Sequence, residues 1–372
     1  MRSTDWATPL AAAPSAVGTM AILLKTASSD AAAGLPVKSR DVVGDKGEVV
    51  SQLPYDLLHS NLQSCSDIGR SAFTESRSTM DYVHKAAISI IRNGGKVESI
   101  LEMLENIEDA RVNLKPEMQS VKRTAEISLE RVRSLTENFQ YWYWMICCLK
   151  NNVLESRGDR NPPSPFHSPA SSPLPAPPLF FFLPSEALSP GAPPSDANKA
   201  CFPAGTVQAK SSRQLSDLKE QVNSLVAFFK SILEEVSATV DNDVEDFLAT
   251  IERGVQTFGD TNIISNINLR KPAQRRIRST ALQIQGSFSG IRDITGTYVA
   301  ISDRYIQPAI NKMEALSATK GDEWDAKSEE FVRWCRQSMR EIEEITRAAA
   351  DGLESNMTER VSYLQHAIES TA

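Results

Sequence analysis

Apolar residues recur at steps of three and four positions along one stretch of the chain, from Leu215 to Phe258. Such spacing places them on one face of a helix, where extra steps of four near the middle and the end interrupt a heptad-like seam. A helix of this length cannot bury its apolar stripe alone. We therefore predict a long central helix with long partner helices. The seam comprises Leu215, Leu218, Val222, Leu225, Phe229, Ile232, Val236, Val240, Val244, Phe247, Ile251, Val255 and Phe258.

The chain before this stretch predicts a helical hairpin over residues 51–157. A thin seam of small apolar residues starts near Pro54 and ends at Gly94-Gly95, which is a strong helix stop signal. A second helical pattern follows at once and continues to Val153. Because the turn between the two patterns is short, the two helices should lie side by side in opposite directions.

The chain after residue 211 predicts three long helices. A second pattern opens at Lys271-Pro272, and Gly321-Asp322 separates it from a charge-rich third one. No convincing strand pattern occurs. We predict an all-α fold, an elongated up-and-down bundle of about five long helices with coiled-coil-like seams, in which residues 212–372 pack with residues 51–157 as one unit.

Residues 1–50 lack this periodicity and are rich in Ala, Ser, Gly and Asp. We therefore predict that they are disordered. We expect no secretory signal, because Asp5 lies near the start and Pro9 and Pro14 interrupt the weakly apolar part. No run approaches the roughly 18 apolar residues that a membrane-spanning helix needs. Met20 begins a second plausible start of the chain, beside Met1.

Residues 158–211 have a different composition, dominated by proline and serine as far as Gly205. Two interpretations are open. One is a proline-rich linker with polyproline II character. The other is a translated intron, since Pro, Ser, Leu and Phe codons are rich in pyrimidines. Without this block, the helical hairpin would join the central helix by a short turn, as helical bundles prefer.

Composition narrows the function classes. The net charge of −7 rests on a mixed charge set, which argues against a dedicated nucleic-acid binder. The five cysteines show no CxxC pairing, as expected for reduced thiols in a cytoplasmic protein. The four histidines are isolated from one another and from the cysteines, so we predict no metal site and no cofactor.

The first candidate contact is the segment 139–149, which is apolar around the whole circumference of its helix. Such a helix is buried or meets another apolar surface. It is therefore either the packed end of a core or a contact for a membrane or a partner, and its Trp and Tyr content suits a water–lipid interface. The candidate contact residues are Phe139, Tyr141, Trp142, Tyr143, Trp144, Met145 and Ile146.

The second candidate is a basic cluster near the start of the fourth predicted helix. It is either a solvated face or a contact for anionic lipid or an acidic partner. Nucleic acid is disfavoured, because no aromatic residues interleave the cluster. Its members are Arg270, Lys271, Arg275, Arg276 and Arg278.

Signals of an enzyme are missing from the chain. We find no nucleophile elbow, phosphate-binding glycine loop, HExxH motif or Glu-x-x-His pair of the di-iron kind. Carboxylate pairs such as Glu234-Glu235 fall on helix surfaces, where charge is ordinary. We therefore predict a protein that is not an enzyme.

The succession of a thin first helix, a long second helix with an aromatic segment at 139–149 and further long helices resembles the elongated α-helical pore-forming toxins. These include the cytolysin A, Bacillus haemolytic enterotoxin and xenorhabdolysin groups. In them a buried apolar hairpin enters the membrane, and here 139–149 is the candidate. The stretch Ser-Asp-Arg-Tyr-Ile-Gln-Pro-Ala-Ile-Asn at 302–311 also resembles uncharacterised fungal long-helix proteins.

Two functions follow from these patterns. The first is a non-enzymatic structural or interaction protein that associates through its helices with itself or with another helical protein. The second is a soluble, membrane-active protein of the pore-former type, in which the basic cluster steers 139–149 to an anionic lipid membrane. The first requires the segment 139–149 to be packed, whereas the second requires it to be mobile or exposed.

Overall fold

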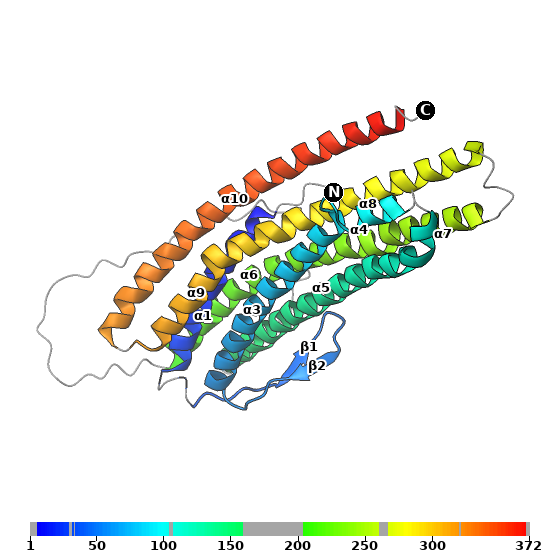
Figure 1. Ribbon diagram of the computed structural model, residues 1–372. Helices are drawn as coiled ribbons and strands as arrows, with labels where there is room; N and C mark the ends of the chain where they lie inside the picture. The colour runs from blue at the N-terminus through cyan, green and yellow to red at the C-terminus, as the bar shows by residue number, and fades with distance from the viewer. Residues whose placement is uncertain are drawn as a thin grey trace, which may run out of the picture.

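The protein is an elongated all-α bundle, as the sequence predicts (Figure 1). Among the described residues, the only sheet is a small hairpin of strands β1 (Asp41–Val43) and β2 (Val49–Gln52). The computed structural model describes residues 6–29, 32, 34–103, 107–158, 204–259, 267–319 and 321–369.

Long helices follow one another along the bundle, and two of them continue through π-helical turns. Turn η1 (Thr239–Val244) joins α6 to α7, and turn η2 (Ser302–Ile306) joins α8 to α9. The helices are α1 (Ala7–Ala27), α3 (Leu58–Ile91), α4 (Lys96–Met103), α5 (Ile107–Gly158), α6 (Ala204–Ala238), α7 (Glu245–Gly259), α8 (Ile267–Ile301), α9 (Gln307–Ser317) and α10 (Asp322–Glu369).

The central seam is buried along α6, η1 and α7, from Leu215 to Ile251. Three consecutive steps of four residues separate Ile232, Val236, Val240 and Val244. The residues Val240 and Val244 lie in η1. Because an α-helix has 3.6 residues per turn, each such step moves the apolar stripe off its face. A π turn holds more residues per turn. It therefore keeps these valines facing the core. Val255 and Phe258 have side chains outside the described set.

A second π turn, η2, falls within the stretch 302–311 that the sequence analysis singled out. Pro308 follows it in the first turn of α9. Proline lacks a backbone N–H and crowds the preceding turn of a helix. The wider π turn η2 therefore lies just before Pro308, where the missing N–H interrupts the regular hydrogen bonding of an α-helix.

Helix α1 corrects the prediction that residues 1–50 are disordered. It packs against α3, α6, α9 and α10 in the interior of the bundle, and Figure 1 shows it crossing between them in blue. Most of its side chains are buried, including Leu10, Val17 and Met20. Pro9 lies in the first turn, where the missing N–H has no helical partner to lose, so only Pro14 removes an internal hydrogen bond.

The same helix also corrects the prediction that no apolar run approaches the length of a membrane-spanning helix. Helix α1 is long and apolar enough to cross a membrane, and most of it is buried in the bundle. A buried core helix and a signal sequence share this composition. Met20 lies in the middle of α1, so a chain starting there would lack buried residues such as Leu10 and Val17.

Two further boundaries differ from those expected. The β1–β2 hairpin lies in the segment expected to be disordered and continues into the first residues of the expected helical hairpin, so that α3 begins only at Leu58. Helix α6 begins at Ala204, within the expected linker 158–211, and α5 continues to Gly158. Residues 159–203, on which the linker and intron interpretations depend, lie outside the described residues.

Helices α5 and α6 run antiparallel in a steady register. The Thr136 hydroxyl donates a hydrogen bond to the carbonyl oxygen of Phe229 on α6. Lys122 forms an ion pair at 2.6 Å with Glu245, the first residue of α7, which continues α6 beyond η1. Further along, the Lys219 ammonium lies 5.6 Å from the ring centre of Tyr143. If the same alignment continues to the end of α5, Gly158 lies opposite Ala204, the first residue of α6.

We expect that residues 159–203 are dispensable for the fold. Packed helix axes lie about 8–10 Å apart, and a loop of four or five residues at about 3.3–3.6 Å each spans that distance. Replacing 159–203 with a short Gly/Ser loop should leave the melting temperature within about 2 °C of that of the full chain. Circular dichroism during heating checks this. A broad or lost transition would contradict the register.

Candidate functional site

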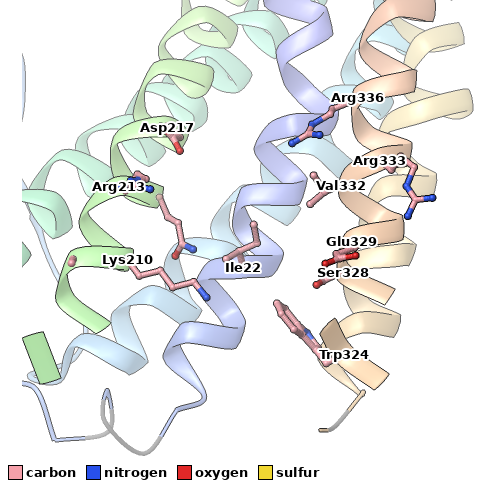
Figure 2. A pocket seen from close by; sticks show the side chains of 12 residues that line it. Ile22, Lys210, Arg213, Asp217, Trp324, Ser328, Glu329, Val332, Arg333 and Arg336 are labelled. Atoms are coloured by element: carbon pink, nitrogen blue, oxygen red, sulfur yellow. The ribbon is translucent and has the colours of Figure 1, made fainter. Parts of the chain in front are cut away.

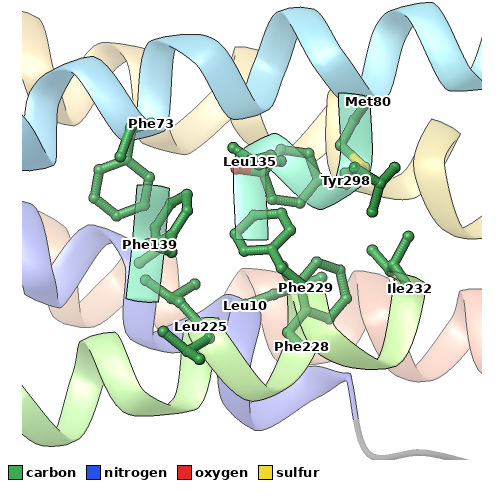
Figure 3. Packing of buried hydrophobic residues seen from close by; sticks show 14 of the residues in the cluster. Leu10, Phe73, Met80, Leu135, Phe139, Leu225, Phe228, Phe229, Ile232 and Tyr298 are labelled. Atoms are coloured by element: carbon green, nitrogen blue, oxygen red, sulfur yellow. The ribbon is translucent and has the colours of Figure 1, made fainter. Parts of the chain in front are cut away.

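The inner face of the segment 139–149 belongs to the core. Phe139, Trp142, Met145 and Ile146 are fully buried. The Trp142 ring packs edge-on against Phe73 with centroids 5.8 Å apart, and the Phe139 and Phe229 rings are 4.6 Å apart. Figure 3 shows Phe73, Phe139 and Phe229 converging from α3, α5 and α6. This half of the apolar segment therefore holds three helices together.

The outer face of the same segment lies under the β1–β2 hairpin. Trp144 donates a hydrogen bond from Nε1 to Oδ1 of Asp45 at 2.8 Å, and the Cys148 thiol lies 3.3 Å from the carbonyl oxygen of Asp41. Val42 points inward and is fully buried. The hairpin therefore explains why this helix is apolar on the side that faces away from the bundle.

Asn152 fixes the chain that leads into the hairpin. Its Oδ1 accepts hydrogen bonds from the backbone N–H groups of Lys38 and Ser39 at 2.7 and 2.9 Å. Its Nδ2 donates to the carbonyl oxygen of Ser39 at 2.7 Å. Because a buried amide satisfies three backbone groups here, the hairpin is anchored to α5 by more than apolar contact.

The third side of the segment faces α6. Tyr143 lies beneath the ammonium group of Lys219, and burial is the main cause that raises the pKa of its phenol, with a further contribution from Cys147. The segment thus meets the core, the hairpin and α6 around its circumference.

This packing corrects part of the predicted contact site. Phe139, Trp142, Met145 and Ile146 cannot touch a partner or a membrane while the bundle is closed. Tyr141, Tyr143 and Trp144 are only partly exposed. The requirement of the first predicted function, that 139–149 is packed, is met in this structure.

The hairpin is the surface that the sequence analysis missed. Five of the seven exposed large apolar side chains among the described residues lie within residues 43–57, so this is where apolar surface gathers. They are Val43, Val49, Val50, Tyr55 and Leu57. The signal was present in the sequence, since two Val-Val pairs flank Gly-Asp-Lys-Gly, a loop that permits a hairpin. Gly47 uses that freedom, with φ at +81°.

The basic cluster lies at the start of α8, and Figure 1 shows that end of the helix far from the hairpin. Arg275, Arg276 and Arg278 are exposed, whereas the side chains of Arg270 and Lys271 lie outside the described residues. The structure does not bring this cluster together with the segment 139–149. Contact with an anionic surface remains a prediction.

Buried thiols have little nucleophilic character here. Burial raises the pKa of Cys65 and of Cys335 to about 12, and that of Cys148 to about 11. These thiols stay protonated at neutral pH, and the thiolate is the reactive form. Across the described part of the chain, no group of three or more His, Cys, Asp or Glu side chains is placed to hold a metal ion.

The helical bundle and its hairpin are the features on which a function can be argued. No protein-family model matches the chain, and no curated protein or solved structure matches it either.

Proposed function

We propose that this chain is a non-enzymatic interaction protein, in which the bundle is a rigid support and the β1–β2 hairpin carries the contact surface. The observation that carries this proposal is the gathering of exposed apolar side chains at 43–57. Contiguous exposed apolar surface on a soluble domain marks an interaction site more often than scattered apolar residues do. The bundle supports it because Val42 and Asn152 hold the hairpin on α5.

The partner that fits this surface is a second copy of the chain. Val43 and Val49 are cross-strand neighbours, and 43% and 58% of their surfaces are exposed. Each strand of a two-stranded sheet also has an outer edge with backbone groups that no other strand pairs. Two hairpins placed edge to edge would pair those groups and bring the exposed valines of the two copies together on one face of a larger sheet.

This mode of association differs in its contact surface from the helix–helix mode that the sequence suggests. The apolar residues of the central seam, from Leu215 to Ile251, are buried inside the bundle and are not available to a partner. Among the described residues, exposed large apolar side chains on helices are limited to Ile127 and Leu154, both on α5. The hairpin therefore offers more apolar contact area than a helix face does.

We expect the purified full chain to form a dimer at micromolar concentration, and Val49→Lys to weaken that dimer about tenfold or more. Lysine on an exposed strand disfavours edge-to-edge pairing, and the two copies would bring like charges together. Sedimentation equilibrium measures the dissociation constant. Val49 is exposed, so the variant should unfold at the same temperature as the parent chain.

Ile127→Lys is the matched control, because it places the same charge at an exposed apolar position outside the hairpin. It should leave the dissociation constant unchanged. A parent chain that is monomeric over the whole concentration range would contradict the proposal. Equal weakening by both variants would also contradict it, since the effect would then come from net charge.

A second candidate function is entry into a membrane, and the observation that favours it is α1. An apolar helix stored inside a bundle could leave it and meet lipid, which would need the contacts with α3, α6, α9 and α10 to open. The dimer preparation can be mixed with dye-loaded anionic liposomes. Release of the dye by the parent chain and by Val49→Lys alike would favour this candidate over the hairpin interface.

A further inference from the structure

A groove crosses the bundle surface where α1 lies between α6 and α10. Its volume is about 750 Å³, which is within the range of small-molecule sites. Figure 2 shows Ile22 of α1 at its floor, with α6 on one side and α10 on the other. The two walls of the groove, α6 and α10, each make a side-chain contact with α1. The Thr26 hydroxyl lies 3.3 Å from Oε1 of Gln214 on α6, and the Lys25 ammonium lies 5.2 Å from the Trp324 ring centre.

The floor of the groove is apolar and aromatic. Trp324 is buried except for 8% of its surface, yet its side chain lines the groove together with Ile22 and Val332. An indole face offers a large rigid contact to an apolar ligand. A small hydrophilic anion would leave this floor in contact with water.

The walls of the groove are positively charged overall. Lys210 and Arg213 line it from α6, and Arg333 and Arg336 line it from α10. Two carboxylates also line it, but each has an arginine one helical turn away on its own helix. Asp217 follows Arg213 by four residues, and Glu329 precedes Arg333 by four.

The other two cations, Lys210 and Arg336, have no Asp or Glu three or four positions away on their own helices. Burial raises the pKa of the Asp217 carboxyl, and the nearby Glu220 carboxylate raises it further. The Arg213 guanidinium is close enough to act in the opposite direction and lower that pKa. Neither Lys210 nor Arg336 forms an ion pair with another residue that the structure describes. In Figure 2 the Lys210 and Arg336 side chains extend toward the groove, whereas the Arg333 guanidinium points away from it.

We propose that this groove binds a single-chain anionic amphiphile, of the long-chain carboxylate class. Its head is held by Lys210 and Arg336, and its apolar chain lies over Ile22 and against Trp324. Charge-assisted hydrogen bonds fix the head, and burial of the chain against the aromatic floor supplies the rest of the affinity. This site is independent of the hairpin and of the dimer.

Binding of a fluorescent fatty acid, dansyl-undecanoic acid, to the full chain tests the proposal. We expect saturable binding at one site per chain, and displacement of the probe by oleate. Lys210→Glu with Arg336→Glu should weaken probe binding about tenfold or more, because both head-group contacts become repulsive. Both side chains are exposed, so the double variant should keep the melting temperature of the parent.

Two controls separate this site from general attraction of anions to the surface. Arg347→Glu with Arg340→Glu places the same charge change on exposed positions of α10 outside the groove, and it should leave probe binding unchanged. The matching fatty alcohol, which lacks the charge, should compete much less well than oleate. Inorganic phosphate, which lacks the chain, should not compete.

Three results would overturn the proposal. The first is equal probe affinity in the groove variant and the parent chain. The second is competition by phosphate as strong as that by oleate, which would mean a simple anion site. The third is competition by the fatty alcohol as strong as that by oleate, which would mean that Lys210 and Arg336 do not hold the head.

Discussion

Replacing Trp142 with alanine is expected to lower the free energy of unfolding by about 3–5 kcal/mol, the range for deleting a buried tryptophan or phenylalanine side chain. Trp142 is fully buried where α1, α3 and α5 meet, and its ring packs edge-on against both Phe73 and Phe139. Those rings come from two helices, so the cavity could not close without moving the backbone. Denaturant unfolding followed by circular dichroism measures the loss.

Trp144→Ala is the matched control, two residues further along the same helix. Trp144 is partly exposed and donates one hydrogen bond to Asp45, so its loss should cost only about 1 kcal/mol. A Trp142 variant as stable as the parent chain would mean that this segment is not packed in solution. That result, combined with lost binding to anionic liposomes, would favour the membrane-active function instead.

Replacing Gly69 with alanine is expected to destabilise the fold by about 1–3 kcal/mol or more, because it overpacks a closed junction. A Cβ atom at this position would lie 2.6 Å from Sδ of Met20 on α1 and 2.7 Å from Cε2 of Trp142 on α5. The flexible Met20 side chain can move aside, but the indole ring is held by its neighbours. The midpoint of thermal unfolding should fall accordingly.

Gly286→Ala gives the opposite expectation on α8. A Cβ atom there would meet nothing within 4 Å, and alanine favours a helix interior over glycine by about 1 kcal/mol. This variant should therefore be slightly more stable than the parent chain. If both alanines destabilised the protein equally, the loss at Gly69 could not be assigned to the junction with Trp142.

The sequence was sufficient for the long helices that display an apolar stripe on one face. The seam from Leu215 to Ile251, the stop at Gly94-Gly95 and the break at Gly321-Asp322 all lie where the pattern indicates. It was insufficient for α1, because a helix that is buried on nearly every side shows no stripe. Its alanines and two prolines looked like loop composition, and the surrounding helices override that local signal.

The candidate site was recognised only in part, for a related reason. The all-round apolar character of 139–149 was evident, but the surface that covers its outer side comes from residues 38–52, far away in the sequence. The structure accounts for Gly296, whose missing side chain makes room for the ring of His84 on α3. The groove beside Trp324 combines residues from three distant helices, and no local pattern could place them together.

The central position of α1 has a consequence for how the protein is made. This helix is synthesised before the helices that enclose it, and two of these, α6 and α10, begin only at Ala204 and Asp322. At about 5–20 residues per second, a ribosome needs of the order of 15–60 s to reach α10 after finishing α1. During that time a helix apolar enough to cross a membrane has only some of its neighbours to pack against. Nascent chains of this protein should therefore depend on chaperones that shield apolar segments during translation.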